Sequence, residues 1–271
     1  MTRARSRRRA YGTLAEVYDR VYAWKDYRKE SAVIARLIRR WGPRPARTLL
    51  DVACGTGAHL RYLARSFDCT GLDASPEMLA VARRAVPRAR FVRGRMPRFD
   101  LHQQYDVVTC LFSAIGYVRD ERTLRATIGT FARHLAPGGL LIVEPWLTPS
   151  LWTPGPVHLS TVPSRQTPIA RMNTSITRRG RSLMDMHYLV GDGERIRHWV
   201  ERHDMGLFSV RQTKAAFRAA GLSVQRIPSG FYGPTHTERG LYLGIRPTTP
   251  HRSANGRSAD RGSRPTGGGR A

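Results

Sequence analysis

The chain has 271 residues, of which 41% are hydrophobic, so it is long enough for one α/β domain with a sizeable core and an insertion. Its formal net charge is +26, but 43 of its 46 basic residues are arginine and they are spread along the chain. This charge predicts loose attraction to polyanions and no specific nucleic-acid partner.

Apolar runs and cysteines limit the class of protein further. The chain has no apolar run of about 18 residues, and its Arg-rich start lacks the apolar stretch of a signal peptide. Its three cysteines form no CxxC pair, which argues against disulfides and zinc. We therefore predict a cytoplasmic protein with no membrane partner and no metal.

Two basic segments flank the predicted domain. Residues 1–9 are mostly arginine, and residues 247–271 are rich in Pro, Gly, Ser, Thr and Arg without apolar periodicity. Such compositions bury too little apolar surface to fold, so we expect disordered basic tails. The domain between them is expected over residues 10–246.

Helical and strand patterns alternate from the start of this domain. Helices are expected over 12–24 and 28–41, and prolines 43 and 45 end the second. Further helices are expected from Leu60, from Pro76 behind the N-cap Ser75, and over 124–135. The expected strands are 47–52, 68–73, 91–92, 105–111 and, after the turn 137–139, 140–143. This alternation predicts an α/β fold with a mostly parallel sheet.

The pattern changes between residues 147 and 208. Segments 170–176, 183–190 and 196–205 lack helical periodicity, and a Gly-Asp-Gly turn joins the last two. They predict an antiparallel insertion after strand 140–143 that covers the substrate entrance. A dimer surface is the alternative, and it does not exclude this role. His187, His198 and His203 are expected to be packed or surface residues. A helix over 210–220 and strands 222–227 and 240–245 are expected to complete the main sheet.

The most informative motif is the run from Leu49 to His59, which reads as an apolar strand, an acid and a tight glycine turn into a helix. Gly55 and Gly57 permit backbone angles and close approaches that a Cβ would block. The run lacks the Gly-Lys-Ser/Thr ending of a phosphate loop, and alanines replace a glycine of the dinucleotide fingerprint. The turn therefore predicts a cofactor site of another kind.

A second acidic residue follows at the expected distance. Asp73 ends the strand 68–73, 22 residues after Asp51. In doubly wound sheets an acid at this place accepts hydrogen bonds from a ribose diol. Asp51, the Gly-Thr-Gly turn and Asp73 together look like the S-adenosylmethionine site of a Rossmann-like class I methyltransferase. The alternative is a purely structural turn with Asp73 as a helix cap.

The chain resembles the sugar-nucleotide N,N-dimethyltransferases over about residues 11–246. The segments that carry this resemblance are 51–60, 108–117, 134–139, Glu-Pro-Trp at 144–146 and Arg-Gly-Leu at 239–241. The resemblance implies an enzyme that methylates the amino group of a small molecule such as a dTDP-linked amino sugar in antibiotic biosynthesis, with S-adenosylmethionine as cofactor. Small-molecule O-methylation remains an alternative, and so does a nucleic-acid methyltransferase, although Thr-Cys-Leu-Phe at 109–112 is not the run that base amino methylation uses. A homodimer is also expected.

Site residues follow from the resemblance residue by residue. It implies that the cofactor is bound by Tyr18, Tyr27, Asp51, Ala53, Gly55, Gly57, Asp73, Met96 and Leu111. It implies that the substrate is bound by Glu144, Trp146 and Arg239, with Tyr117 and Tyr11 as catalytic residues. Core packing is the alternative for Met96, Leu111 and Trp146. One departure concerns Arg95, which stands where the family often has an Asp for the adenine amino group, because arginine offers no acceptor.

Overall fold

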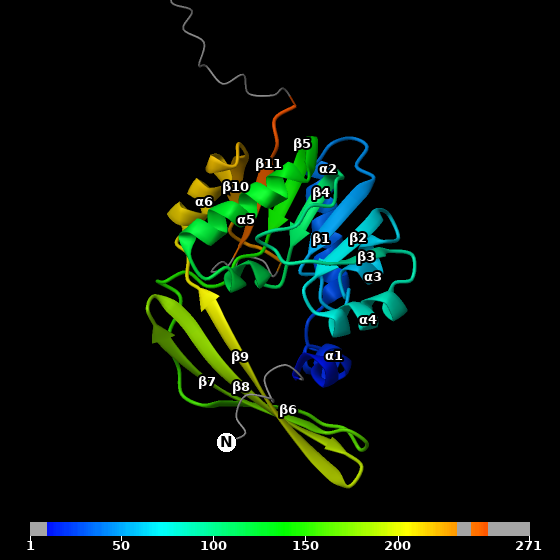
Figure 1. Ribbon diagram of the computed structural model, residues 1–271, viewed down its shortest axis with the longest axis vertical. Coiled ribbons are helices and arrows are strands. Elements are labelled where there is room, and N and C mark those ends of the chain that lie inside the picture. The colour runs from blue at the N-terminus through cyan, green and yellow to red at the C-terminus, as the bar shows by residue number, and fades with distance from the viewer. Residues whose placement is uncertain (1–9, 232–239, 249–271) are drawn as a thin grey trace, which may run out of the picture.

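The computed structural model describes residues 10–231 and 240–248. The main body is a seven-stranded sheet in the order β10-β11-β5-β4-β1-β2-β3 (Figure 1). The strands are β1 (Thr48–Val52), β2 (Asp68–Asp73), β3 (Arg90–Arg93), β4 (Tyr105–Cys110), β5 (Leu135–Val143), β10 (Ser223–Ile227) and β11 (Leu241–Ile245). Neighbouring strands are parallel except that β11 is antiparallel to both β5 and β10. This confirms the predicted Rossmann-like α/β sheet.

Helices cover both faces of this sheet. The helices are α1 (Ala10–Val21), α2 (Tyr27–Trp41), α3 (Leu60–Leu63), α4 (Pro76–Ala85), α5 (Glu121–Arg133) and α6 (Val210–Ala219). Successive strand residues point to opposite faces, so Leu49 packs under α2 and α3 while Leu50 packs under α5 and α6. Two hydrophobic cores result, one on each face, and they hold the ends of the central strands in place.

N-caps explain where the helices begin. The side chains of Asp26, Ser75, Asp120 and Ser209 each accept a hydrogen bond from a backbone N–H of the first turn. The predicted helix 124–135 therefore begins earlier, at Glu121, directly after its cap.

The prediction that a turn at residues 137–139 precedes the strand is wrong. These residues lie inside β5, where the register against β4 shifts between the pairs Tyr105–Leu135 and Val107–Leu140. Gly138 adopts a φ of 76°, so the glycines accommodate an irregularity within the strand.

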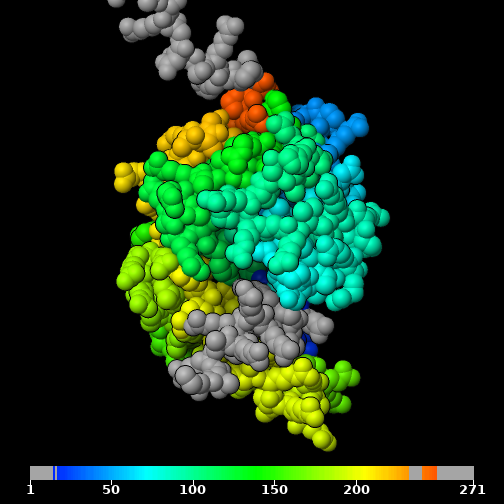
Figure 2. Space-filling model, viewed as in Figure 1, coloured from blue at the N-terminus to red at the C-terminus, as the bar shows by residue number. Residues whose placement is uncertain are grey.

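The insertion is a separate four-stranded antiparallel sheet in the order β6-β7-β8-β9. Its strands are β6 (His158–Val162), β7 (Ile169–Arg178), β8 (Arg181–Asp192) and β9 (Arg195–Gly206), and β6 was not predicted. In Figures 1 and 2 this sheet, coloured green to yellow, projects from the end of the body where α1 lies. Its inner face packs Ile169, Tyr188 and Val190 against Val21, the last residue of α1, and against Tyr22, which follows it.

No helix among the described residues is long and apolar enough to cross a membrane. The predicted disordered tails lie outside the described residues, apart from 247 and 248.

Candidate active site

The sheet order reverses between β1 and β4, so their carboxyl ends flank the crevice where open α/β sheets bind ligands. Ala53 follows β1, and Phe112 and Ser113 follow β4 closely. All three have a positive φ, of 60°, 50° and 59°, although none is a glycine. Such a conformation costs of order 1–3 kcal/mol per residue and clusters at functional sites. The backbone strain therefore marks this crevice as the candidate active site.

The glycine turn opens into this crevice. Gly55 and Gly57 have φ values of 55° and 75°, and a Cβ added at Gly55 would meet no atom within 4 Å. The Gly55 N–H donates to Asp73 Oδ2 at 2.8 Å, and the Ser75 N–H donates to Asp73 Oδ1 at 2.8 Å. Each carboxylate oxygen keeps a second lone pair, so Asp73 can also accept hydrogen bonds from a diol. Burial raises the pKa of Asp73 above its ordinary value.

Asp51 is an acid held in an apolar place. Its side chain is buried at the end of β1, and its Oδ1 accepts a hydrogen bond from the Thr109 hydroxyl at 2.7 Å. Burial raises the pKa of Asp51 to about 6, against the smaller opposing effects of His59 and Thr109. A cationic ligand group beside Asp51 would favour its charged form.

Side-chain contacts hold helix α1 against the glycine turn. The Thr56 hydroxyl donates to Asp19 Oδ1 at 2.6 Å, and Arg61 Nη2 lies 2.6 Å from Asp19 Oδ2. The same helix carries Tyr18, whose ring centroid lies 4.6 Å from that of Tyr22, the residue directly after the helix. Burial raises the pKa of Tyr18 well above its ordinary value, so its phenol stays protonated. Sequence reasoning placed Tyr18 at the site but missed Asp19.

A buried cluster of ionisable side chains lies close to the glycine turn and consists of Lys25, Glu30 and His59. The Glu30 carboxylate pairs with the Lys25 ammonium, and its other oxygen lies 2.7 Å from His59 Nε2. Burial acts to raise the pKa of Glu30, but His59 and Lys25 together hold it below its ordinary value. The cluster joins the start of α2 to the segment that follows the glycine turn. No pattern in the sequence singled it out.

Tyr27 and Glu144 border the same cluster. The Tyr27 ring packs edge-on against His59 with centroids 5.0 Å apart, and burial raises its pKa. Glu144 is buried and accepts a hydrogen bond from the Phe112 N–H at 2.5 Å. Burial raises the pKa of Glu144, and Lys25 opposes that shift. Glu144 therefore braces the left-handed residue Phe112 at the end of β4.

Tyr117 meets the inserted sheet. It ends the short 3-10 helix Ala114–Tyr117, and its Oη lies 2.5 Å from Nδ1 of His203 on β9. Nε2 of His203 lies 3.3 Å from Oε2 of Glu201. His203 is 8% exposed and Glu201 is 7% exposed, so both are buried. The sequence interpretation of His203 as a packed residue missed its contact with Tyr117, and Glu201 was not singled out.

The remaining predicted residues differ in their placement. The Trp146 indole N–H donates to the Ser182 hydroxyl at 2.8 Å, and its Cβ lies 2.9 Å from where a Cβ of Gly116 would stand. Leu111 is buried, and Met96 is half-buried with its sulfur 3.8 Å from that of Cys110. Both pack in the hydrophobic cores, and their contact with a cofactor stays a prediction. Arg239 and the side chain of Tyr11 lie outside the described residues.

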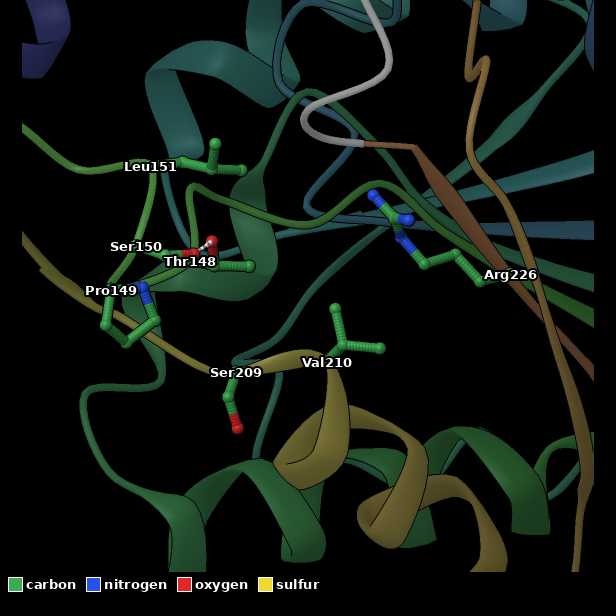
Figure 3. Close-up of a pocket in the computed structure, with 7 residues that line it drawn as sticks. All are labelled: Thr148, Pro149, Ser150, Leu151, Ser209, Val210 and Arg226. Atoms are coloured by element: carbon green, nitrogen blue, oxygen red, sulfur yellow. Dashed lines mark hydrogen bonds between the residues drawn. The ribbon is translucent and has the colours of Figure 1, made fainter.

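A cavity of about 460 Å³ lies beside the segment that follows Trp146. It is lined by Thr148, Pro149, Ser150, Leu151, Ser209, Val210 and Arg226. Figure 3 shows the Arg226 side chain extending from β10 toward the residues that follow β5. The cavity therefore offers one guanidinium and several hydroxyl groups.

Comparisons with known proteins agree with this geometry. Residues 49–139 match the family model described as a methyltransferase domain. The chain is 43% identical to dTDP-3-amino-3,6-dideoxy-alpha-D-glucopyranose N,N-dimethyltransferase of Streptomyces fradiae, over 86% of this chain and 91% of that protein.

Two solved structures are similar in sequence and fold. DesVI of Streptomyces venezuelae is 38% identical, with a TM-score of 0.79 over 86% of this chain and 98% of that one. CalS10 of Micromonospora echinaspora, an amino pentose methyltransferase solved with bound S-adenosylmethionine, is 36% identical, with a TM-score of 0.75 over 85% and 96% of the two chains.

Proposed function

The chain belongs to the family of dTDP-amino-sugar N,N-dimethyltransferases, and we propose that it transfers methyl groups from S-adenosylmethionine to the amino nitrogen of a dTDP-linked amino sugar. The chain is thus an S-adenosylmethionine-dependent N-methyltransferase. The finer statement, a dTDP-linked sugar as acceptor, rests mainly on one observation: the likeness to these enzymes covers 86% of this chain and more than nine-tenths of each relative, and so extends far beyond the glycine turn.

The residues around the glycine turn fit the cofactor. Gly55 leaves room for a ligand to approach the backbone, and Asp73 keeps lone pairs for the two hydroxyls of a ribose. A nearby positive charge favours the charged form of Asp51, and the cofactor carries two positively charged groups, an ammonium and a sulfonium. Arg95 is exposed after β3 and gives the adenine amino group no acceptor, so adenine depends on backbone contacts and stacking.

The cofactor supplies an already activated methyl group on its sulfonium sulfur, so the chain's task is to position an amine with a free lone pair. Orientation and removal of water can supply a large part of such a rate enhancement. Helix α1 and the inserted sheet shield the crevice, since β9 contacts both α1 and the 3-10 helix that carries Tyr117. We propose that Tyr117 accepts a hydrogen bond from the amine and directs its lone pair.

The diphosphate of such an acceptor needs positive charge. We propose that the cavity of Figure 3 receives it, with Arg226 as its charged partner. Arg239 remains a proposed substrate contact from the resemblance. The formal net charge of +26 also favours the approach of an anionic sugar nucleotide.

The outer face of the inserted sheet supports a homodimer. Its exposed apolar residues are Leu159, Met172, Ile176, Leu189, Ile196 and Val200. Cross-strand pairing places Leu159, Met172, His187 and Val200 in one row, so these side chains share a face. A face with this many exposed apolar residues typically marks a protein contact, and a second copy can cover it symmetrically. A cytoplasmic location stays a prediction.

The proposed acceptor is tested by incubating the protein with methyl-labelled cofactor and a panel of dTDP-amino sugars that differ in the position of the amine. Matched sugars with a hydroxyl in place of the amine serve as controls. We expect mass spectrometry to show mono- and dimethylated amines for at least one sugar nucleotide. Methylation of the hydroxyl controls alone, or of none of the amino sugars, would refute the proposal.

A further inference from the structure

The inserted sheet brings two buried ionisable side chains to the active site. Glu201 and His203 stand two residues apart on β9, so both point to its inner face. That face packs against α1 and the 3-10 helix Ala114–Tyr117. Two buried polar side chains beside an exposed phenol are costly to keep unless they interact with it.

The three groups form a chain from the crevice into the protein. Tyr117 is 42% exposed, and its Oη lies 2.5 Å from Nδ1 of the buried His203. Nε2 of His203 lies 3.3 Å from the Glu201 carboxylate, at ion-pair distance but without a hydrogen bond between them. A proton on Nε2 is favoured by that carboxylate, which leaves Nδ1 as a hydrogen-bond acceptor. Tyr117 then donates its hydroxyl proton to Nδ1, and its oxygen is the atom that would accept a proton from a group in the crevice.

We propose that Tyr117, His203 and Glu201 form a proton relay that deprotonates the acceptor amine. The substrate ammonium gives one proton to Tyr117 Oη, while the Tyr117 hydroxyl proton passes to His203 Nδ1. The products are a neutral amine, an intact tyrosine and an imidazolium that faces the Glu201 carboxylate. The proton then leaves to water before the next turnover. The relay rests on the proposed transfer to an amine.

The chemistry of the reaction requires such a step. An alkylammonium has no lone pair, and the first methyl transfer creates a secondary ammonium that must lose a proton before the second. A phenol alone is a weak proton acceptor at neutral pH, whereas imidazole is in general the side chain suited to accept a proton in this range. Tyr117 is therefore the residue that contacts the substrate, and His203 and Glu201 act through it.

The neighbours of the relay are mainly neutral. Tyr18 faces it from α1, Tyr22 from directly after α1 and Tyr188 from β8, and burial raises the pKa of all three phenols. Arg171 of β7 acts on Tyr22 and Tyr188 and adds a positive charge. Glu201 offsets that charge and is the negative group that lies 3.3 Å from the His203 ring.

The test compares His203→Gln with wild type on two acceptors. One is the amino sugar, protonated at pH 7, and the other is its oxyamino analogue, whose nitrogen is neutral at that pH. We expect His203→Gln to lower kcat for the amino sugar by about 100-fold, as for loss of a positioned proton acceptor. We expect little change in KM and less than about 3-fold loss with the oxyamino analogue. Glu201→Gln should show the same selectivity with a smaller loss, and Tyr117→Phe should lose about 10- to 100-fold.

His187→Gln is the matched control, because His187 lies on the outer face of the same sheet and stacks on His198. It should leave both acceptors unaffected. A second readout is independent of turnover: ¹⁵N NMR of the His203 ring should show an imidazolium when amino sugar binds with S-adenosylhomocysteine, and Tyr117→Phe should abolish it.

Equal loss on both acceptors, or no loss on either, would overturn the relay while wild-type methylation of the amino sugar still supports the proposed function. Failure of wild type on every amine would refute the proposed function itself.

Discussion

We predict that ionisation of the buried Asp51 carboxylate lowers the free energy of unfolding of the ligand-free protein. Its pKa rises from 3.8 to about 6 because the side chain is buried. Below about pH 4 both the folded and the unfolded chain hold this proton, so no cost arises. Between about pH 4 and 6 the unfolded chain loses the proton first, and above pH 6 the folded protein carries a buried charge. The cost is then about 1 kcal/mol at pH 4.5 and about 3 kcal/mol at pH 8.

Asp51→Asn removes this ionisation and keeps the size of the side chain. The free energy of unfolding of the variant, measured relative to wild type, should be about 2 kcal/mol higher at pH 8 than at pH 4.5. Urea unfolding of both proteins at the two pH values measures this difference, and other carboxylates cancel in it. A stability difference that does not change with pH would refute the reasoning.

Asp51 should also matter for the cofactor. A cationic ligand stabilises the charged carboxylate, so S-adenosylmethionine should restore part of the lost stability in wild type and less in Asp51→Asn. Thermal unfolding with and without the cofactor at pH 8 gives the comparison. A larger cofactor-induced rise in Tm for the variant would contradict this account.

Three further predictions concern other parts of the molecule. Glu30→Gln should destabilise the protein by about 3–5 kcal/mol because Lys25 loses its buried carboxylate partner, whereas Glu194→Gln on the exposed turn after β8 should change stability by less than about 0.5 kcal/mol in the same urea assay. Asp73→Ala should weaken cofactor binding at least about tenfold by calorimetry, and Asp68→Ala at the other end of β2 should not; unchanged affinity in folded Asp73→Ala would remove Asp73 from the site. Leu189→Lys with Val200→Lys should give a monomer in sedimentation, and a wild type that is already monomeric at high concentration would refute the dimer.

Local signals were enough to predict most of the main sheet. Strand β1, the glycine turn and β2 depend on residues close in sequence, and Ser75 with Pro76 determined the start of α4. The errors fell where the signal was weak or ambiguous. Strand β6 is a short edge strand without clear alternation, and the Pro-Gly-Gly of residues 137–139 is equally compatible with a turn and with a bulge.

The candidate site was less predictable because its contacts join distant segments. Thr56 and Asp19 are 37 residues apart, His59 and Glu30 are 29 apart, and Tyr117 and His203 are 86 apart. Composition and spacing carry no information on such pairs. The positions of Tyr18, Tyr117, Glu144 and Trp146 came from a family resemblance, whereas the partners of these residues required the three-dimensional arrangement.

Binding of the cofactor and binding of the acceptor depend on different parts of the molecule. Asp51 and Asp73 belong to strands of the main sheet and Gly55 to the turn after β1, whereas the phenol of Tyr18 comes from α1 and the imidazole of His203 from the inserted sheet. Changes in β9 can therefore alter the acceptor without disturbing the glycine turn. The contact between Asp19 and Thr56 connects the two parts, because it places the helix that carries Tyr18 directly on that turn. Breaking it with Asp19→Asn should weaken binding of the acceptor and of the cofactor together, whereas a change confined to His203 should leave cofactor affinity intact.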